Sequence, residues 1–424
     1  MEKREVVVIG GGMAGLLTAF FLQKEGKDVL LLEGKKVASG QTGRTTAKIT
    51  SQHGLKYSNL IKKVGLAKAR LYARANEDTI NMYERLIDDE GIECDFERVP
   101  AYLYSCRSSK AIEEEANGAD CVGIDAFMTR KNQLPFDVKA TLCFPRQAQF
   151  TPLKFVGAIA GKLEIRENEM VRDIKGHRII TDKEELWADK IVVATHYPFI
   201  NVPGFYFLRQ HQERSYVLAL KGNELMDGMY YGIDDDGLSL RQEGDRLLLG
   251  GGGHRTGKKG GGFEALIKAR EEFFPEAVID SRWAAQDCMP HDGIPFIGKY
   301  SVFTPHMYVA TGFQKWGMTT SMVAAELLTD LICGRENPYE SLFTPQRFNW
   351  AAGIKDFLID SGESVINLSK GIMSRPRCSH LGCKLQWNLQ ERSWDCPCHG
   401  SRFDEEGNVL DNPSLKKLIF MQKP

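Results

Sequence analysis

Apolar and polar residues near the start of the chain follow first a strand pattern and then a helix pattern. Residues 6–9 are β-branched and apolar, as in a buried strand, and the glycine motif Gly10-Gly-Gly12-Met-Ala-Gly15 follows without a gap. The pattern then predicts a helix over Met13–Lys24 and a second strand over 28–32, which ends in Glu33. A strand–helix–strand unit of this kind predicts an α/β domain with a parallel sheet.

Periodicity also predicts elements in the next third of the chain. An amphipathic helix is expected over 66–90, and a second helix opens at Pro152. Short strands are expected over 170–174, 178–181, 185–188 and 191–194.

The region 205–290 is rich in strand patterns. They lie at 214–220, 238–241 and 246–249, and Gly and Asp bound them, which favours an antiparallel sheet. A last strand near 308–311 leads into a helix that we expect Thr319 or Thr320 to cap and Gly334 to end.

Composition narrows the class of protein. The 424 residues, 42% of them apolar, are enough for two or three domains with real cores. The formal net charge of −1 and the scattered Lys and Arg predict no nucleic-acid partner. Glycines interrupt the apolar run 6–22, so neither a signal peptide nor an integral membrane segment is expected. A cytoplasmic location is predicted from the six cysteines that show no close pairing: Cys94, Cys106, Cys121, Cys143, Cys288 and Cys333.

The glycine motif has the spacing of a dinucleotide site. Gly10 permits a tight turn, Gly12 lets the backbone approach a pyrophosphate, and Gly15 lets the helix pack on the strand. Glu33 can accept hydrogen bonds from ribose hydroxyls. A glycine-rich turn without a ligand is the alternative. Three more segments end in small residues, as strands do where backbone approaches a flat ligand: 37–48, 191–197 and 308–319.

Two short cysteine–histidine motifs stand near the end of the chain. Cys378-Ser-His380 and Cys396-Pro-Cys-His399 supply two thiolates and two imidazoles, the ligand set of a Rieske-type [2Fe–2S] cluster. The same residue types suit structural zinc, so zinc is an alternative. Zinc explains neither the proline nor the second cysteine pair, Cys383 and Cys398.

These motifs resemble known families over nearly the whole chain. The strings His-Leu-Gly-Cys and Cys-Pro-Cys-His-Gly-Ser resemble Rieske proteins, in which the inner cysteines, here Cys383 and Cys398, form a disulfide. Residues 1–345 resemble FAD-dependent oxidoreductases of the D-amino-acid oxidase and glycine oxidase type, and the 40–48 loop is similar to that of bacterial members with a C-terminal Rieske extension. The resemblance implies FAD and a [2Fe–2S] cluster as cofactors. It implies metal ligands at Cys378, His380, Cys396 and His399, and FAD contacts at Gly10, Gly12, Met13, Ala14, Gly15, Glu33, Gly40, Thr42, Arg44, Thr45, Thr46, Ala47, Val171, Ala194, Thr195, Gly312, Gly317, Met318 and Thr319.

The expected fold class is α/β: a Rossmann-type FAD-binding domain, an inserted antiparallel-sheet substrate domain and a small all-β Rieske-type module. We expect the FAD domain at 1–90, 149–204 and 291–345, and the substrate domain at 91–148 and 205–290. A connector, 346–373, with a helix near 352–358, would lead to the module at 374–424.

The resemblance implies a dehydrogenase that oxidises an amine or amino acid at a C–N bond. Electrons would pass from flavin to the cluster and on to an external acceptor. Three alternatives stay open: an electron-transfer or redox-sensing protein without its own substrate, a flavoprotein with a zinc tail, and a tRNA-modifying flavoprotein. The near-neutral charge counts against the last.

Candidate substrate residues are polar and stand near strand ends. His254 and Lys315 are preferred as catalytic residues because glycines bound both strand ends. The other candidates are Arg146, Gln149, Tyr216, Arg241, His291, Asp292 and Trp316. The loop offers Thr45, Thr46 and Ala47 where a covalent flavin would need a reactive side chain, so noncovalent FAD is expected rather than attachment at His53.

The iron–sulfur segment departs from its family in one respect. Only a short stretch precedes Cys378 where Rieske folds have several base strands. Either strands of the FAD domain replace this platform, or the cluster is exposed. Phe403 stands where high-potential relatives often carry Tyr, which predicts a reduction potential below respiratory Rieske centres and above plant-type ferredoxins.

Overall fold

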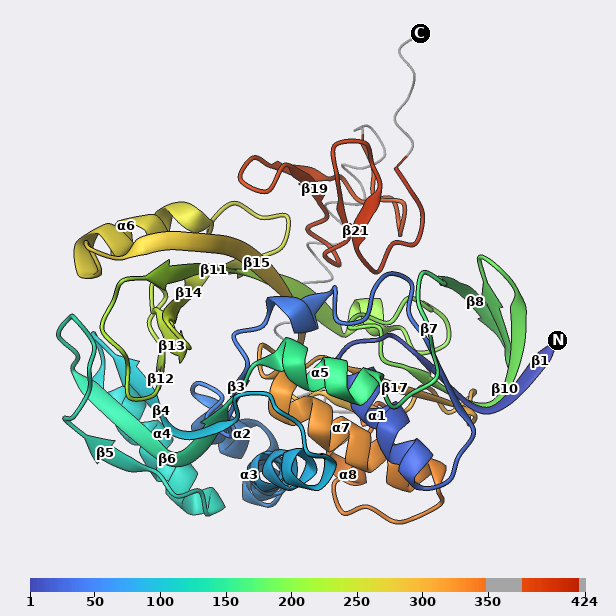
Figure 1. Ribbon diagram of the computed structural model, residues 1–424, viewed down its shortest axis with the longest axis horizontal. Coiled ribbons are helices and arrows are strands. Elements are labelled where there is room, and N and C mark those ends of the chain that lie inside the picture. The colour runs from blue at the N-terminus through green and yellow to red at the C-terminus, as the bar shows by residue number, and fades with distance from the viewer. Residues whose placement is uncertain (348–375, 419–424) are drawn as a thin grey trace, which may run out of the picture.

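The computed structural model describes residues 1–347 and 376–418, in which three sheets and their helices are resolved (Figure 1). The first sheet has the order β16-β17-β10-β1-β2-β7, with β9 added beside β10 and β8 beside β9. Strands β1, β2, β7, β10 and β17 pair in parallel. The bounds are β1 Glu2–Ile9, β2 Val29–Leu32, β7 Ile165–Arg166, β8 Val171–Lys175, β9 Arg178–Thr181, β10 Glu185–Val193, β16 Phe296–Lys299 and β17 Met307–Thr311.

Strand β1 lies at the centre of this sheet and is covered on both faces. Val6, Val7 and Val8 are fully buried. Val6 and Val8 belong to the buried cluster that holds helices α1 (Met13–Lys24) and α7 (Gly317–Ile332), whereas Val7 belongs to a second cluster, with Tyr206 and Tyr300, on the other face. A strand covered on both faces reads as a continuous apolar run, which explains the sequence pattern.

The second sheet holds nine strands, in the order β15-β11-β14-β13-β12-β4-β6-β3, with β5 beside β6. Its pairings are antiparallel except that of β12 with β4. The bounds are β3 Lys48–Ile49, β4 Glu97–Ser105, β5 Phe127–Thr129, β6 Ala140–Gln149, β11 Gln210–Lys221, β12 Met229–Gly232, β13 Ser239–Glu243, β14 Arg246–Arg255 and β15 Val278–Pro290.

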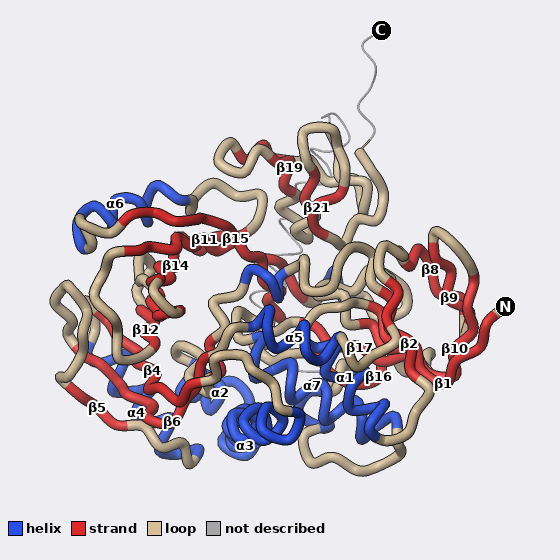
Figure 2. Tube along the Cα trace, viewed as in Figure 1, coloured by secondary structure: helices blue, strands red, loops and turns tan. Residues whose placement is uncertain are grey.

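Most of the helices gather on one side of the molecule, away from β11 and β15 (Figure 2). They are α2 (Lys56–Val64), α3 (Leu66–Glu90), α4 (Ser109–Val122), α5 (Pro152–Ala160) and α8 (Glu340–Phe343) together with α1 and α7. Helix α6 (Phe263–Phe273) lies beside β11 and β15 instead (Figure 1). Two short 3-10 turns, η1 (Gln41–Arg44) and η2 (Tyr206–Leu208), precede β3 and β11. None of the helices in the described ranges combines the length and the apolar character that a membrane crossing requires.

The C-terminal module, residues 376–418, is a small antiparallel sheet of β18 (Gln386–Asn388), β19 (Ser393–Asp395), β20 (Arg402–Phe403) and β21 (Val409–Asp411). The Cys383–Cys398 disulfide joins its two loops, as the resemblance implied. The module sits above β15 and η1 (Figure 1). Of the four predicted ligands, Cys378, Cys396 and His399 are buried, at 2%, 0% and 3% exposed, whereas His380 is partly exposed.

The predicted fold class is confirmed, and several elements differ in detail. The two strands expected at 185–188 and 191–194 form the single strand β10. The predicted cap of the last long helix is wrong, because α7 begins at Gly317 with Trp316 as its N-cap. Gln314 and Lys315 have positive φ, and this sharp turn starts the helix before Thr319. The helix expected near 352–358 lies outside the described residues, and the domain boundaries stay a prediction.

Candidate functional site

A cavity of about 1000 Å³ runs from the glycine motif to the inner face of β11 and β14. The carboxyl ends of β1, β2, β10 and β17 meet at its edge, because these strands are parallel. At these ends, Ile9 lies beside Leu32 and Val193, and Val193 lies beside Val309. Nucleotides bind at this edge of open α/β sheets.

The glycine motif leaves room for a pyrophosphate at this edge. Gly10 has φ +113°, and a Cβ there would lie 2.5 Å from the Ala194 carbonyl oxygen. At Gly15 a Cβ would lie 1.9 Å from the Gly10 carbonyl oxygen, so helix and strand touch through backbone. Helix α1 begins after Gly12 without a side-chain cap, and such an N-terminus attracts phosphate. The Glu33 carboxylate accepts hydrogen bonds at 2.7 Å from the Gly11 and Lys35 amides. The residues present therefore fit a dinucleotide.

Most of the predicted FAD contacts line this cavity. They are Gly10, Gly12, Met13, Ala14, Glu33, Gly40, Thr42, Arg44, Thr45, Thr46, Val171, Ala194, Thr195, Gly312, Gly317 and Met318. Gly15, Ala47 and Thr319 lie behind the lining. Ala47 is fully buried, and the Thr319 hydroxyl donates to the Thr50 carbonyl at 3.3 Å. As FAD contacts all of these residues stay predictions.

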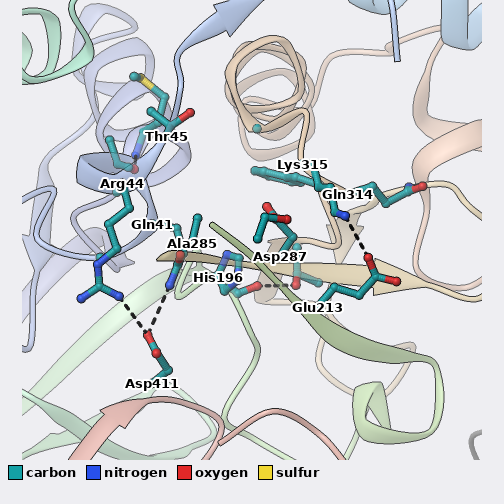
Figure 3. Close-up of a pocket in the computed structure, with 18 of the residues that line it drawn as sticks. Gln41, Arg44, Thr45, His196, Glu213, Ala285, Asp287, Gln314, Lys315 and Asp411 are labelled. Carbon is teal, nitrogen blue, oxygen red and sulfur yellow. Dashed lines mark hydrogen bonds and ion pairs between the residues drawn. The ribbon is translucent and has the colours of Figure 1, made fainter. Parts of the chain in front are cut away.

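Charged side chains meet at the far end of the cavity (Figure 3). Lys315 Nζ lies 3.0 Å from Glu213 Oε2. Burial opposes the charge on Lys315, but Glu213, Tyr231 and Asp287 together outweigh burial and raise the Lys315 pKa. Burial would likewise raise the Glu213 pKa, yet His211 and Lys315 hold it at about 2. Burial raises the pKa of Asp287 to about 6, against the opposing pull of Lys315. Two carboxylates thus share one ammonium group.

The preferred catalytic residues, His254 and Lys315, both line the cavity, as do Tyr216 and Trp316. The His254 ring stacks on Tyr216 with centroids 5.7 Å apart, and burial lowers its pKa. Sequence reasoning missed Lys48, whose Nζ donates to Ser239 Oγ at 2.6 Å and whose pKa burial lowers to about 7.

The remaining candidates stand outside the lining. Arg146 forms an exposed ion pair with Asp125. Arg241 donates to the Thr46 and Phe150 carbonyls and, at 3.2 Å, to Gln149.

His291 and Asp292 also lie outside the lining. Asp292 pairs with Arg347 at 2.7 Å. His53 lines the cavity, but its Nδ1 is bonded to Tyr72 and its Nε2 to Thr50.

Strands β11 and β15 form a wall between this cavity and the C-terminal module. Side chains alternate across a strand, so one face of each strand looks into the cavity and the other toward the module. The cavity face carries Glu213, Ser215, Val217, Ala285, Asp287 and Met289. On the module face, Gln212 Nε2 donates to the His399 carbonyl at 2.7 Å. Gln286 Nε2 donates to the Gly400 carbonyl at 2.8 Å. A single layer of sheet separates the two sites.

The module brings the four predicted metal ligands together. The rings of His380 and His399 are perpendicular, with centroids 5.1 Å apart. His380 Nδ1 is buried without a hydrogen-bond partner, while Nε2 is held by Asn201 Oδ1 at 2.8 Å. A buried nitrogen without a partner needs an explanation, and a metal ion supplies one. An orienting bond at the other ring nitrogen is typical of ligating imidazoles.

The cysteine sulfurs support the same site. Those of Cys383, Cys396 and Cys398 lie within 4.8 Å of one another, and the disulfide between the first and last leaves Cys396 as the thiol of this group. Cys378, on the other loop, shares a hydrogen bond with Cys396. Two thiols and two imidazoles in one buried place fit a Rieske-type cluster.

Comparison with known proteins agrees with both sites. Residues 5–331 match the family model "FAD dependent oxidoreductase" and residues 367–422 match "Rieske [2Fe-2S] domain". The chain is 35% identical to the Bacillus subtilis (strain 168) protein named "Putative Rieske 2Fe-2S iron-sulfur protein YhfW", over 98% of this chain and 92% of that protein.

Among the solved structures that share the fold are an L-proline dehydrogenase and a glycine oxidase. L-proline dehydrogenase from P. horikoshii has a TM-score of 0.68 at 20% identity, covering 82% of this chain and 98% of that one. Glycine oxidase from Geobacillus kaustophilus has a TM-score of 0.67 at 16% identity, covering 82% of this chain and 100% of that one. The chain therefore belongs to the FAD-dependent oxidoreductase family and carries a Rieske [2Fe–2S] domain at its C-terminal end.

Proposed function

We propose that this oxidoreductase is a dehydrogenase that oxidises an amine or amino acid at a C–N bond and delivers the electrons, by way of its Rieske cluster, to an external acceptor. When bound, FAD supplies two-electron chemistry and the cluster accepts one electron at a time. The observation that carries the proposal is the β11–β15 wall, which has the substrate cavity on one face and the cluster loop on the other.

The charges in the cavity support a cationic substrate. At the Lys315 end of the cavity, Glu213 and Asp287 supply two carboxylates beside one ammonium group (Figure 3), while Lys48 and Lys56 line the cavity elsewhere. A protonated amine is attracted to the net negative charge, and Lys315 offers a partner for a substrate carboxylate. The names of the structural neighbours, L-proline dehydrogenase and glycine oxidase, point to the same substrate class.

Helix α7 supports electron uptake in the cavity. Its first residues, Gly317 and Met318, line the cavity, and Trp316 provides no side-chain cap. The positive end of the helix dipole stabilises negative charge placed against it. This helix start would stabilise the negative charge that a bound flavin takes up on reduction.

The polar side chains on the module face fix the cluster loop against the wall. Gln212 also donates to the Asn412 carbonyl at 3.0 Å, and Gln286 Nε2 donates to Gln212 Oε1 at 2.7 Å. The two amides thus hold three module carbonyls in one network, and this keeps the path for electrons short. The cytoplasmic location and the nature of the acceptor stay predictions.

Anaerobic mixing tests the proposal. Purified protein is mixed with a panel of amines and amino acids, and the flavin absorbance is followed while iron, sulfide and zinc are counted. Bleaching by one class, with two irons per FAD, supports the dehydrogenase. If no member of the panel bleaches the flavin but an external donor reduces the cluster, the electron-transfer or redox-sensing alternative holds. Zinc in place of iron would contradict the electron route.

A further inference from the structure

Part of the cavity wall belongs to the C-terminal module and not to the first two sheets. Eight residues between 408 and 417 line the cavity, among them Leu410, Asp411, Asn412 and Leu415. They lie at the nucleotide end, next to Glu33 and Val171, away from Lys315.

The module contacts two loops that carry predicted FAD contacts: a first loop that follows Glu33 and a second loop at 37–48. Lys35, two residues after Glu33, donates from Nζ to the Leu410 carbonyl at 3.0 Å. Gln41, in the second loop, donates from Nε2 to Asp411 Oδ1 at 3.2 Å. Lys35 and Gln41 both line the cavity, as do their neighbours Gly34 and Gly40.

The module also contacts two further segments with predicted FAD contacts. Arg172, next to Val171, donates from Nη1 to the Leu415 carbonyl at 2.9 Å. Asn412 Nδ2 donates to the carbonyls of Thr195 at 2.7 Å and Tyr197 at 2.8 Å. Four segments with predicted FAD contacts, at 33–35, 37–48, 171–172 and 194–197, are therefore tied to one ten-residue stretch of the module.

Asp411 anchors this stretch, and Figure 3 shows its carboxylate beside Arg44 and Gln41. Its carboxylate lies 2.9 Å from Arg402 Nη1 of the module, 3.8 Å from Arg214 Nη1 of β11 and 3.8 Å from Arg44 Nη1 of the second loop. Burial would raise the Asp411 pKa, but these three guanidinium groups hold it at about 2. The carboxylate is thus charged at neutral pH and fixed on three sides.

We propose that residues 408–417 of the Rieske module form a wall of the FAD site, so that FAD retention and module docking are thermodynamically linked. The inference goes beyond the proposed function, because it depends on no substrate. By reciprocity, a module that tightens FAD binding must itself be held more firmly when FAD is bound.

The first arm of the test measures FAD affinity. Asn412→Ala removes both hydrogen bonds to Thr195 and Tyr197 but keeps the backbone carbonyl that Gln212 holds. Two lost hydrogen bonds should weaken FAD binding about tenfold. Flavin fluorescence during titration of the FAD-free holo-cluster protein gives the dissociation constant. The control is Arg392→Ala in an exposed ion pair of the module outside the cavity, where FAD affinity should stay within twofold. An Asn412→Ala affinity equal to that of wild type would overturn the proposal.

The second arm uses the unaltered protein and therefore does not depend on a variant folding. Hydrogen exchange is compared with and without FAD, and the amides of residues 409–415 should exchange more slowly when FAD is bound. Strand β18, which does not line the cavity, serves as the internal reference. Equal exchange at 409–415 in the two states would refute the linkage even if the variant loses its cluster.

Discussion

The docking of the cluster loop can be disturbed from the flavin side without altering the module. Gly257 follows β14 with φ +71°, and a Cβ there would lie 2.5 Å from the Pro397 nitrogen and 2.8 Å from the Cys396 carbonyl carbon. Both atoms are backbone, so they cannot move away by a side-chain rotation. Gly257→Ala must therefore push the cluster loop back by roughly 1 Å to restore ordinary contact.

The cost has two parts that a control separates. Placing Ala in the left-handed region costs about 1–2 kcal/mol whatever the module does. Overpacking against the loop costs about 1–3 kcal/mol more and acts only on the docked state. The ratio of docked to undocked module should fall about 5- to 150-fold. Gly244→Ala is the matched control, because Gly244 has φ +57° in the turn before β14 and nothing lies within 4 Å of its Cβ position.

The assay is electron transfer after a light flash. Anaerobic protein is reduced at the flavin by photoreduction, and reduction of the cluster is followed by absorbance. Gly257→Ala should slow the transfer at least fivefold relative to Gly244→Ala, with equal FAD and iron contents. Equal rates in the two variants would refute the claim that docking at this contact sets the electron path.

Three further outcomes are expected. For a cationic amine, kcat/KM should fall as the pH drops through about 6, because protonation of Asp287 removes a negative charge from the cavity. Asp287→Asn should abolish this fall, and a fall that persists in the variant would contradict the role of Asp287 in binding the amine. Arg214→Leu should destabilise the docked module by about 3–5 kcal/mol, because it leaves the carboxylate of Glu391 in a buried network without one of its partners. The loss of iron on heating measures this destabilisation, and Arg392→Ala, in an exposed ion pair, is the control. Phe403→Tyr should raise the cluster potential by roughly 40 mV, the equivalent of one hydrogen bond for a one-electron couple. A redox titration should place the wild type above the about −400 mV of plant-type ferredoxins. An unchanged potential in the variant would refute the role given to position 403.

Local pattern was enough to predict the nucleotide unit. Helix α1 has the predicted bounds, Met13–Lys24, because a glycine motif starts it and a polar turn ends it. The Cys383–Cys398 disulfide and the meeting of the two cluster motifs were implied by the resemblance to Rieske proteins that the short motifs carry.

What the sequence could not supply was long-range. Helix α6 and strand β15 were missed, since β15 is exposed at its start and alternates only from Trp283 onward. In the sequence, Gln212 and Gln286 are ordinary polar strand residues. Only the fold shows that the module lies against the side of the sheet that carries them. The one available signal was the polar run 210–215 inside a strand, which indicates that both faces of this strand make polar contacts.

The central claim is that electrons pass from flavin to the Rieske cluster inside one chain. Rapid-freeze EPR after flash photoreduction of the flavin, with the protein dilute enough to exclude transfer between molecules, tests it most directly. The low-average-g signal of a reduced Rieske cluster should rise as the flavin reoxidises, at a rate independent of protein concentration. A flavin that stays reduced beside a silent, oxidised cluster would contradict it.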